Sequence, residues 1–427
     1  MNSTKKIIAM LIALAMTFAL CACGSSAPAE APAAPSEAAP AEAPAAASES
    51  APAEETPAGP DDSVNVKIGV LVSDVTSAEA LAFRAYYENY IQSVYNVTFM
   101  YSDELTDAAA EASAIDNFIA NNCKAIISFS SADRPAQIEQ CEANGIYYAV
   151  ATGTLTDEQY ETFKNYEYYV GAIGPDLYTE YMAGYNMAKY YLDQGYTKFG
   201  MFGGATPYYT EMHIYRAAGM LVAMCEAGNG QYMGASDFGG MIGAIYGAGC
   251  QLEPAVIGSV ELCGYVGGYD FDDAWFGKLA AVANDPNVEV LLAVGSGQTA
   301  FAGFKPEGKE LGDIDCFTAD SLALMESGVL NYLEGKFSAS IGPIFMATLS
   351  AVQGQPIRTA DGCALALSQG YWTATNAEEA ANFFAVDSSV TAPAYTREML
   401  DTLFGASYDD FAAFVSAYSF DEISAMA

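Results

Sequence analysis

Residues 168–220 alternate between two sequence patterns, and this alternation constrains the fold more than any other feature of the chain. Short apolar runs that are typical of strands are each followed by a long run with helical spacing. The same alternation is found earlier, at residues 66–74 and 124–131, and later, at residues 288–297 and 314–320. Strands that alternate with helices indicate parallel sheets. We therefore expect an α/β protein with two Rossmann-like lobes, and we expect the chain to cross between them within residues 168–220.

The chain begins with a pattern typical of export. Two lysines precede an apolar run at residues 7–22, which is too short to span a membrane comfortably. The run ends in the letters LCACG, which resemble the lipobox of bacterial lipoproteins. We therefore expect residues 1–22 to be a lipoprotein signal peptide and Cys23 to carry the lipid. An ordinary secretory signal that happens to contain cysteines is the alternative.

A segment of very low complexity follows the leader. Residues 27–62 consist almost entirely of Ala, Pro, Glu and Ser and contain no aromatic residue. Such a composition cannot bury enough apolar surface to order itself. We expect residues 23–63 to be a disordered tether that holds the rest of the protein at the extracytoplasmic face of the cell membrane, with an interaction tail as the alternative.

The remaining part of the chain is large, apolar and acidic. It is longer than one ordinary domain, and 52% of the whole chain is hydrophobic, so we expect two domains with extra elements. The chain has 16 Lys and Arg residues against 53 Asp and Glu residues, for a net charge of −37. This charge repels phosphates. The sequence therefore excludes nucleic acid as a partner.

The order of the segments resembles that of the type 1 periplasmic solute-binding proteins, the family of the ribose- and galactose-binding proteins. The resemblance is carried by YYVGAIGPD at residues 168–176, a helix with small residues at Ala183, Gly184 and Ala188, KFGMFGG at residues 198–204, and a helix with Arg216 before Ala-Ala-Gly-Met. It covers residues 64–367. It implies two lobes that are joined by a hinge of several strands.

The resemblance also implies how the chain is divided. We expect an N-terminal lobe from residues 64–173 and about 344–370, a C-terminal lobe from residues 174–343, and a helical C-terminal extension at residues 371–427. The extension shows helix starts at Asn376, Pro393 and Ser407, and we expect it to pack on one lobe or to form an oligomer contact. A Gly-rich segment at residues 227–249 departs from the family pattern. It is either a surface insertion or a lid over the cleft.

Candidate ligand-binding residues lie where predicted strands end, because an open parallel sheet binds ligands at that edge. Asp74 and Thr152 end strands of the first lobe. In the second lobe the resemblance implies that Asp320 accepts hydrogen bonds from ligand hydroxyls, and it places the following residues at or near family ligand positions: Arg216, Tyr269, Phe271, Trp275 and Ser296. Core packing is the alternative for Tyr269 and Trp275. Asp313 falls in the loop before the strand that leads to Asp320.

Signals for catalysis, metals and cofactors are weak. His213 is the only histidine, and no nucleophile elbow accompanies it. Acidic residues at 270–273 are interpreted as a helix cap rather than a calcium loop. Seven cysteines outside the leader show no metal-ligand spacing, and a bridge between Cys250 and Cys263 stays undecided. We expect no catalytic residue, no metal and no cofactor.

These features predict a membrane-anchored, extracytoplasmic solute-binding protein of an ABC-type uptake system. Its ligand would be a small polar molecule, a sugar or a related metabolite, and its partner an ABC permease. Two alternatives remain. One is a ligand-sensing module of a membrane receptor, and the other is an extracytoplasmic hydrolase that uses two carboxylates in the cleft.

Overall fold

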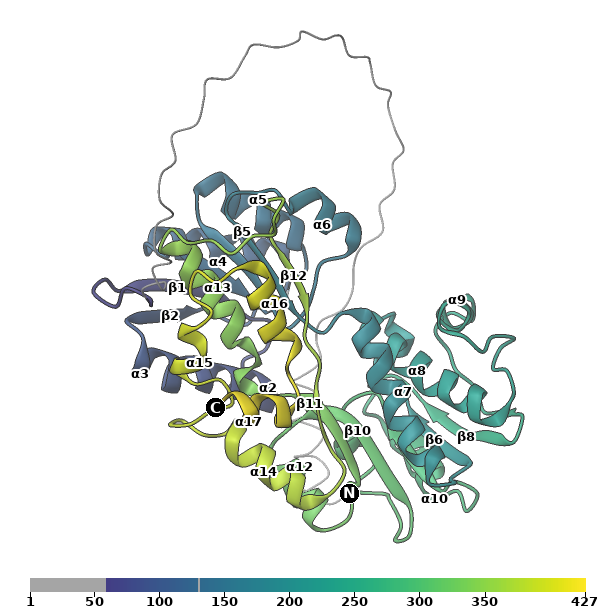
Figure 1. The fold of residues 1–427 in the computed structure, drawn as a ribbon. Helices are drawn as coiled ribbons and strands as arrows, with labels where there is room; N and C mark the ends of the chain where they lie inside the picture. The colour runs from purple at the N-terminus through teal and green to yellow at the C-terminus, as the bar shows by residue number, and fades with distance from the viewer. Residues whose placement is uncertain (1–58, 130) are drawn as a thin grey trace, which may run out of the picture.

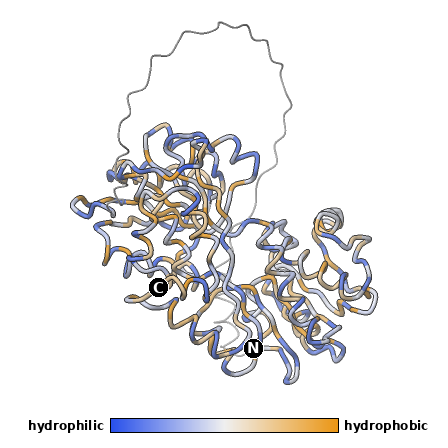
Figure 2. Tube along the Cα trace, viewed as in Figure 1, coloured by the Kyte–Doolittle hydropathy of each residue, from blue (hydrophilic) through white to orange (hydrophobic). Residues whose placement is uncertain are grey.

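The structure is a computed structural model that describes residues 59–129 and 131–427, which form two lobes (Figure 1). Each lobe is built around one sheet with helices on both faces. Hydrophobic residues gather inside both lobes and hydrophilic residues on the outer turns (Figure 2). The predicted signal peptide, the predicted lipidation site Cys23 and all but the last residues of the predicted tether lie outside the described residues.

The first lobe contains a six-stranded sheet in which all strands are parallel. Their order across the sheet is β12 (Leu365–Ser368), β5 (Tyr169–Gly174), β4 (Tyr147–Ala151), β3 (Ala125–Ser128), β1 (Val66–Leu71) and β2 (Val97–Tyr101). One face is covered by α2 (Ala78–Ala85), the π-helical turn η1 (Tyr86–Ile91), α3 (Gln92–Val94) and α13 (Gly342–Val352). The other face is covered by α4 (Ala108–Ala120), α5 (Arg134–Asn144) and α6 (Asp157–Phe163).

The second lobe contains a seven-stranded sheet with a parallel centre. Its order is β13 (Trp372–Ala374), β11 (Tyr332–Lys336), β10 (Glu310–Cys316), β9 (Val290–Ala293), β6 (Lys198–Phe202), β8 (Val260–Val266) and β7 (Ala255–Ile257), and only the edge strands β13 and β7 are antiparallel. One face is covered by α7 (Leu177–Asp193) and α8 (Glu211–Gly228), and the other by α10 (Asp273–Asn284), α11 (Gly297–Ala300) and α12 (Ala319–Glu326). The prediction of an α/β fold with two parallel-sheet lobes is confirmed.

Helices α7 and α8 touch backbone to backbone through two glycines. A Cβ atom on Gly184 would lie 1.9 Å from the carbonyl oxygen of Arg216, and one on Gly219 would lie 1.9 Å from that of Tyr181. Any side chain at these positions would push the helices apart. The small residues that carried the family resemblance therefore have a packing role, because they bring Glu180 and Arg216 within reach of each other.

Aspartate, asparagine, serine and threonine side chains begin most of the helices in the described part of the chain. Each accepts a hydrogen bond from a backbone N–H in the first helical turn, which satisfies a group that the helix itself leaves unpaired. The capping residues are Ser77, Asp107, Asp133, Thr156, Asp176, Asp237, Asp272, Thr318, Asn376, Ser407 and Ser419. The interpretation of residues 270–273 as a helix cap is confirmed at Asp272, which accepts from the N–H of Trp275 at 2.7 Å.

The chain crosses between the lobes three times. The first crossing follows β5, the second runs from β11 through η3 (Ser338–Ile341) into α13, and the third joins β12 to β13. The third crossing is short, at residues 369–371, and it connects an edge strand of the first sheet to an edge strand of the second. These crossings form the hinge.

The C-terminal helices bridge both lobes, so the prediction that they pack on one lobe is wrong. Helix α14 (Ala377–Asp387) packs on α12 of the second lobe, and α15 (Arg397–Asp401) packs on α13 of the first lobe. Helices α16 (Tyr408–Ser416) and α17 (Phe420–Met426) complete the segment, which lies beside the hinge (Figure 1). The helices pack there because their aromatic side chains meet those of the hinge.

Trp372 is the centre of that aromatic contact. Its ring stacks on Phe337 of the second crossing, with ring centroids 4.4 Å apart and planes 8° apart, and it also contacts Phe383 and Phe420. Its indole N–H donates to the carbonyl of Tyr418 at 2.9 Å. The second and third crossings and two C-terminal helices are thus held in one buried cluster.

Two segments have local structure that the sequence pattern does not show, and one helix starts later than predicted. Residues 255–266 form a hairpin of β7 and β8, because Gly258 adopts φ +62° and turns the chain. The Gly-rich segment contains the helix α9 (Phe238–Gly247), which packs on α8. The helix expected to start at Pro393 starts instead after Thr396.

Candidate functional site

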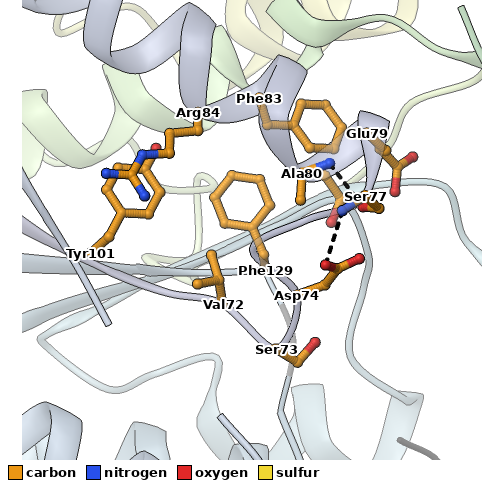
Figure 3. Close-up of a pocket in the computed structure, with 11 residues that line it drawn as sticks. Val72, Ser73, Asp74, Ser77, Glu79, Ala80, Phe83, Arg84, Tyr101 and Phe129 are labelled. Carbon is orange, nitrogen blue, oxygen red and sulfur yellow. Dashed lines mark hydrogen bonds between the residues drawn. The ribbon is translucent and has the colours of Figure 1, made fainter. Parts of the chain in front are cut away.

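A pocket of about 130 Å³ opens at the carboxyl ends of β1, β2, β3 and β4 in the first lobe. It is the edge at which an open parallel sheet binds ligands. Its apolar and aromatic lining consists of Val72, Ala80, Phe83, Tyr101 and Phe129, and its polar lining consists of Ser73, Asp74, Ser77, Glu79, Arg84 and Thr152. Figure 3 shows the rings of Phe83 and Phe129 between Arg84 and Tyr101 on one side and Asp74, Ser77 and Glu79 on the other.

The aromatic part of the pocket leaves one polar atom unused. The rings of Phe83 and Phe129 lie 5.5 Å apart, and the guanidinium of Arg84 lies 4.5 Å from the ring centre of Tyr101 while pairing with Glu88 at 2.9 Å. The Tyr101 hydroxyl is buried and has no hydrogen-bond partner among the described residues. Burial raises the pKa of Tyr101, so the hydroxyl keeps its proton. A ligand in the pocket can satisfy this group.

Asp74 is held ionised by the start of α2. Its Oδ1 accepts hydrogen bonds from the N–H groups of Thr76 and Ser77 at 2.8 and 3.0 Å. Burial acts to raise the pKa of Asp74, but the hydrogen bonds from Ser77 and Thr76 outweigh it and lower the pKa overall. The carboxylate therefore offers a fixed negative charge at the pocket.

The second lobe presents a polar edge beside this pocket. Asp315, near the end of β10, accepts at Oδ2 from the N–H of Ser296 at 3.1 Å and from the side chain of Gln298 at 3.2 Å. The rings of Tyr269 and Phe271 stack nearby at 5.9 Å, after the end of β8. These side chains are partly exposed and available to a ligand.

An ion pair joins this edge to the first lobe. Glu79 of the pocket accepts a hydrogen bond from Lys336, the last residue of β11, at 3.2 Å. Lys336 is in register with Cys316, the neighbour of Asp315 in β10. The pocket in the first lobe therefore lies next to the strand ends of the second lobe.

Four of the eight non-glycine residues with positive φ in the described part of the chain follow strands at this edge of the two sheets. Thr152, Tyr209, Phe271 and Ser296 have φ of 60°, 61°, 52° and 56°. This left-handed conformation is unfavourable for residues with a Cβ, and most of all for a β-branched one such as Thr152. Residues held in strained conformations cluster at functional sites. Three of the four were candidate ligand residues from the sequence.

The other candidates lie in different surroundings. Asp320 is exposed in the first turn of α12. Trp275 is buried, with its indole N–H donating to the carbonyl of Gly268 at 2.9 Å and its ring packed on Phe202 and Phe271. Asp313 lies within β10 and not in the loop before it, because the strand starts at Glu310. We assign Trp275 to packing around the site.

Arg216 belongs to a buried polar network at the hinge. Its Nε donates to Glu180 at 2.7 Å, and its Nη1 donates to the carbonyls of Val294 and Ile314 at 2.7 and 3.3 Å. Its Nη2 donates to the hydroxyl of Tyr371 in the third crossing at 3.2 Å, and that hydroxyl donates to Glu180 at 2.6 Å. The side chains of Arg216 and Glu180 are both about 5% exposed. The guanidinium is therefore occupied by the protein, and the network ties two helices to the hinge.

Glu334 in β11 is a second buried acid in this region. It is 6% exposed and accepts a hydrogen bond from Tyr332 at 2.6 Å. Burial raises the pKa of Glu334 to about 8 from an ordinary value of 4.5. Between these pH values the folded protein keeps a proton that the unfolded chain has released, so stability falls as the pH rises.

The variant Glu334→Gln is therefore expected to be more stable than the parent at pH 8, by about 1–3 kcal/mol, and little changed at pH 4.5. The amide can still accept from Tyr332 and carries no charge. Denaturant unfolding at both pH values checks this, with the exposed Glu378→Gln as the control. A gain of the same size at both pH values would contradict the assignment of a buried proton.

His213 and the cysteines have the following surroundings in the described part of the chain. His213 accepts a hydrogen bond at Nδ1 from the N–H of Ala205 at 2.8 Å, and burial lowers the pKa of His213 to about 3. All seven cysteines of the described part of the chain, Cys250 and Cys263 included, are free thiols. Residues 59–129 and 131–427 contain no group of three or more His, Cys, Asp or Glu side chains arranged to hold a metal ion. No helix in these ranges is long and apolar enough to cross a membrane.

Sequence reasoning missed several pocket residues. Tyr101 ends β2 and Phe129 follows β3, so the rule that strand ends bind ligands would have found them. Phe83 and Arg84 come from α2, and no local signal in the sequence shows which way that helix turns its side chains. Asp315 was overlooked because the end of its strand was placed too far along the chain.

Comparison with solved structures finds the same architecture. An ABC transporter solute binding protein from Actinobacillus succinogenes 130z with bound D-allose matches with a TM-score of 0.53 and 12% identity, over 74% of this chain and all of its own. An ABC transporter solute binding protein from Bacillus halodurans C-125 with bound myo-inositol matches with a TM-score of 0.51 and 17% identity, over 76% of this chain and 99% of its own. The fructose binding periplasmic domain of a hybrid two component system matches with a TM-score of 0.51 and 12% identity, over 75% of this chain and 93% of its own.

Neither a family model nor a curated protein sequence matches the chain. The structural matches show that the chain has the type 1 periplasmic binding protein fold, and this prediction from the sequence is confirmed.

Proposed function

We propose that the protein is a lipid-anchored, extracytoplasmic solute-binding protein that captures a small polar molecule, a sugar or a related metabolite, for an ABC permease. The observation that carries the proposal is the pocket at the carboxyl edge of the first sheet, which lies next to strained strand ends of the second sheet. Proteins of the same fold hold D-allose and myo-inositol.

The proposed ligand touches both lobes. Asp74 and Thr152 contact it from the first lobe, and Tyr269, Phe271, Ser296 and Asp315 contact it from the second. A ligand that bridges two lobes favours their closed arrangement through its higher affinity for that state. The hinge permits this motion because the two sheets are joined by three short crossings.

A ligand screen with matched variants tests the proposal. Thermal shift over sugars, nucleosides and amino acids identifies the ligand, because a bound ligand raises the melting temperature. Asp315→Asn should then weaken binding by about five- to a hundredfold, since an unpaired polar group in a closed cleft costs about 1–3 kcal/mol. Asp320→Asn serves as the comparison, because Asp320 is exposed at the start of α12. Calorimetry on both variants measures the effect.

Two outcomes would contradict this assignment. Equal affinities of the two aspartate variants would remove Asp315 from the site. An unchanged radius of gyration at saturating ligand, measured by small-angle scattering, would argue against closure of the lobes.

The proposed anchor is tested by fractionation. Cys23→Ser should move the protein from the membrane fraction to the soluble fraction of the producing cells, because the thiol that carries the lipid is lost. Cys21→Ser is the matched control and should leave the protein in the membrane fraction. A Cys23→Ser variant that stays membrane-bound would overturn the anchor.

A sensor domain is the second candidate function, since the same fold occurs in the fructose binding periplasmic domain of a two component system. Cross-linking of this protein to its neighbours in the membrane distinguishes the transport function from the sensor function, because the cross-linked partner is a permease in the first case and a receptor in the second. The proteins of this fold that the comparison finds are described as binding proteins, which gives the hydrolase alternative no support.

A further inference from the structure

We propose that the ligand is an unphosphorylated nucleoside with a single-ring base, whose base enters the first-lobe pocket and whose ribose faces the second lobe. This inference rests on the proposed function and names the class of ligand. It follows from the size of the pocket, the arrangement of its apolar and polar side chains, and the charge around it.

The size of the pocket limits what can enter. Its volume of about 130 Å³ is close to that of a cavity that binds one benzene molecule, about 150 Å³. The pocket therefore has room for one six-membered ring, and the fused rings of a purine would extend beyond it. The remainder of the ligand must extend out of the pocket toward the second lobe.

The side chains around the pocket fit a flat ring better than a sugar. Val72, Phe83 and Phe129 offer no hydrogen bonds, and the two phenyl rings provide surfaces on which a planar ring can stack. Polar side chains lie on two sides of the phenyl rings, Asp74 on one and Tyr101 beside Arg84 on the other (Figure 3), and the Tyr101 hydroxyl has no hydrogen-bond partner among the described residues. A pyranose has hydroxyls around its whole rim and would leave some of them unpaired. A nucleobase has apolar faces and polar groups only at its edge.

The second lobe supplies acceptors for ribose hydroxyls. Asp315 and Gln298 lie at its edge, and the Oε1 atom of Gln298 is buried without a hydrogen-bond partner among the described residues. Hydroxyls of a ribose donate to such oxygens. Asp74 and Asp315 form no ion pair with any cation of the described residues. The cations at the pocket, Arg84 and Lys336, already pair with Glu88 and Glu79, so a phosphate beside the ionised Asp74 would be repelled, and the nucleoside fits where the nucleotide does not.

Calorimetry on the full protein with five probes tests the inference: uridine, cytidine, adenosine, ribose and uridine 5′-monophosphate. Uridine or cytidine should bind about a hundredfold more tightly than ribose, because stacking and edge hydrogen bonds are lost with the base. Adenosine and the monophosphate should each bind at least about tenfold more weakly than the preferred nucleoside.

Matched variants locate the base. Phe129→Leu keeps an apolar side chain but removes the stacking surface, and it should lower affinity for the preferred nucleoside by about tenfold. Phe276→Leu, on α10 outside the pocket, should leave affinity unchanged. The melting temperature of each unliganded variant shows that it is folded.

Other results would overturn the inference in distinguishable ways. If ribose or another plain sugar binds as tightly as any nucleoside, the inference fails and the solute-binding function stands. If adenosine or the monophosphate binds best, the assigned ring size or charge is wrong. If no sugar, nucleoside or amino acid raises the melting temperature, the proposed function fails together with the inference.

Discussion

Replacement of Arg216 by methionine is expected to lower the free energy of unfolding by about 3–5 kcal/mol. The substitution leaves Glu180 buried beside α8 with its charge no longer paired. It also leaves the carbonyls of Val294 and Ile314 without their donor. Removing one partner of a buried ion pair costs more than the pair contributes, since the desolvation penalty of the remaining charge is no longer offset.

Two further variants make the Arg216 prediction specific. Glu180→Leu combined with Arg216→Met removes both charges and should recover a large part of the loss. Lys189→Met breaks an exposed ion pair with Asp193 on α7, the helix that also carries Glu180, and should lower the free energy of unfolding by less than about 1 kcal/mol. Denaturant unfolding of the four proteins measures these differences. If Arg216→Met is as stable as Lys189→Met, the buried network does not support the hinge.

Replacement of Trp372 by alanine is the second change with a large expected effect, about 3–5 kcal/mol of unfolding free energy. The indole is 1% exposed and stacks on Phe337, so its removal leaves a cavity among side chains that cannot all collapse into it. It also removes the donor to the carbonyl of Tyr418. Because the cluster joins the hinge to the C-terminal helices, these helices should become more sensitive to proteolysis.

Trp372→Phe is the matched comparison, since it keeps a ring to stack on Phe337, and it should lose clearly less stability than Trp372→Ala. Limited proteolysis with mass spectrometry reports whether residues near Phe420 are cut first. An alanine variant within about 1 kcal/mol of the parent, with an intact C-terminal segment, would show that the cluster is not a main support of the fold.

The fold was predictable because its signals are local. Each central strand is an apolar run followed by a helical period, and the order of these runs gives parallel sheets. The hairpin at Gly258 and the helix α9 were missed because a short run of apolar and glycine residues does not show by itself where the chain turns or coils. The placement of the C-terminal helices depends on aromatic contacts with distant residues, which no local pattern reveals.

The candidate site was predictable only where a residue is placed by its own strand. Asp74, Thr152 and Ser296 follow strands, and the strand direction alone brings them to the carboxyl edges of the sheets, where the candidate site lies. Trp275 and Arg216 lie on helices, where the direction of a side chain depends on helix rotation and on the neighbouring packing. In the structure the Trp275 ring packs against Phe202, and the Arg216 guanidinium donates to Glu180.

The third crossing has a consequence for how the protein folds. Strand β12 covers the edge of β5, and β13 covers the edge of β11, so one short segment near the C-terminus protects a free edge of each sheet. A chain synthesised from its N-terminus exposes both edges until residues 365–374 are available, and exposed strand edges pair readily with other chains. Contacts between residues so far apart in sequence also form slowly. Folding intermediates of this protein should therefore aggregate through these two edges, and a chain truncated before β12 should do so permanently.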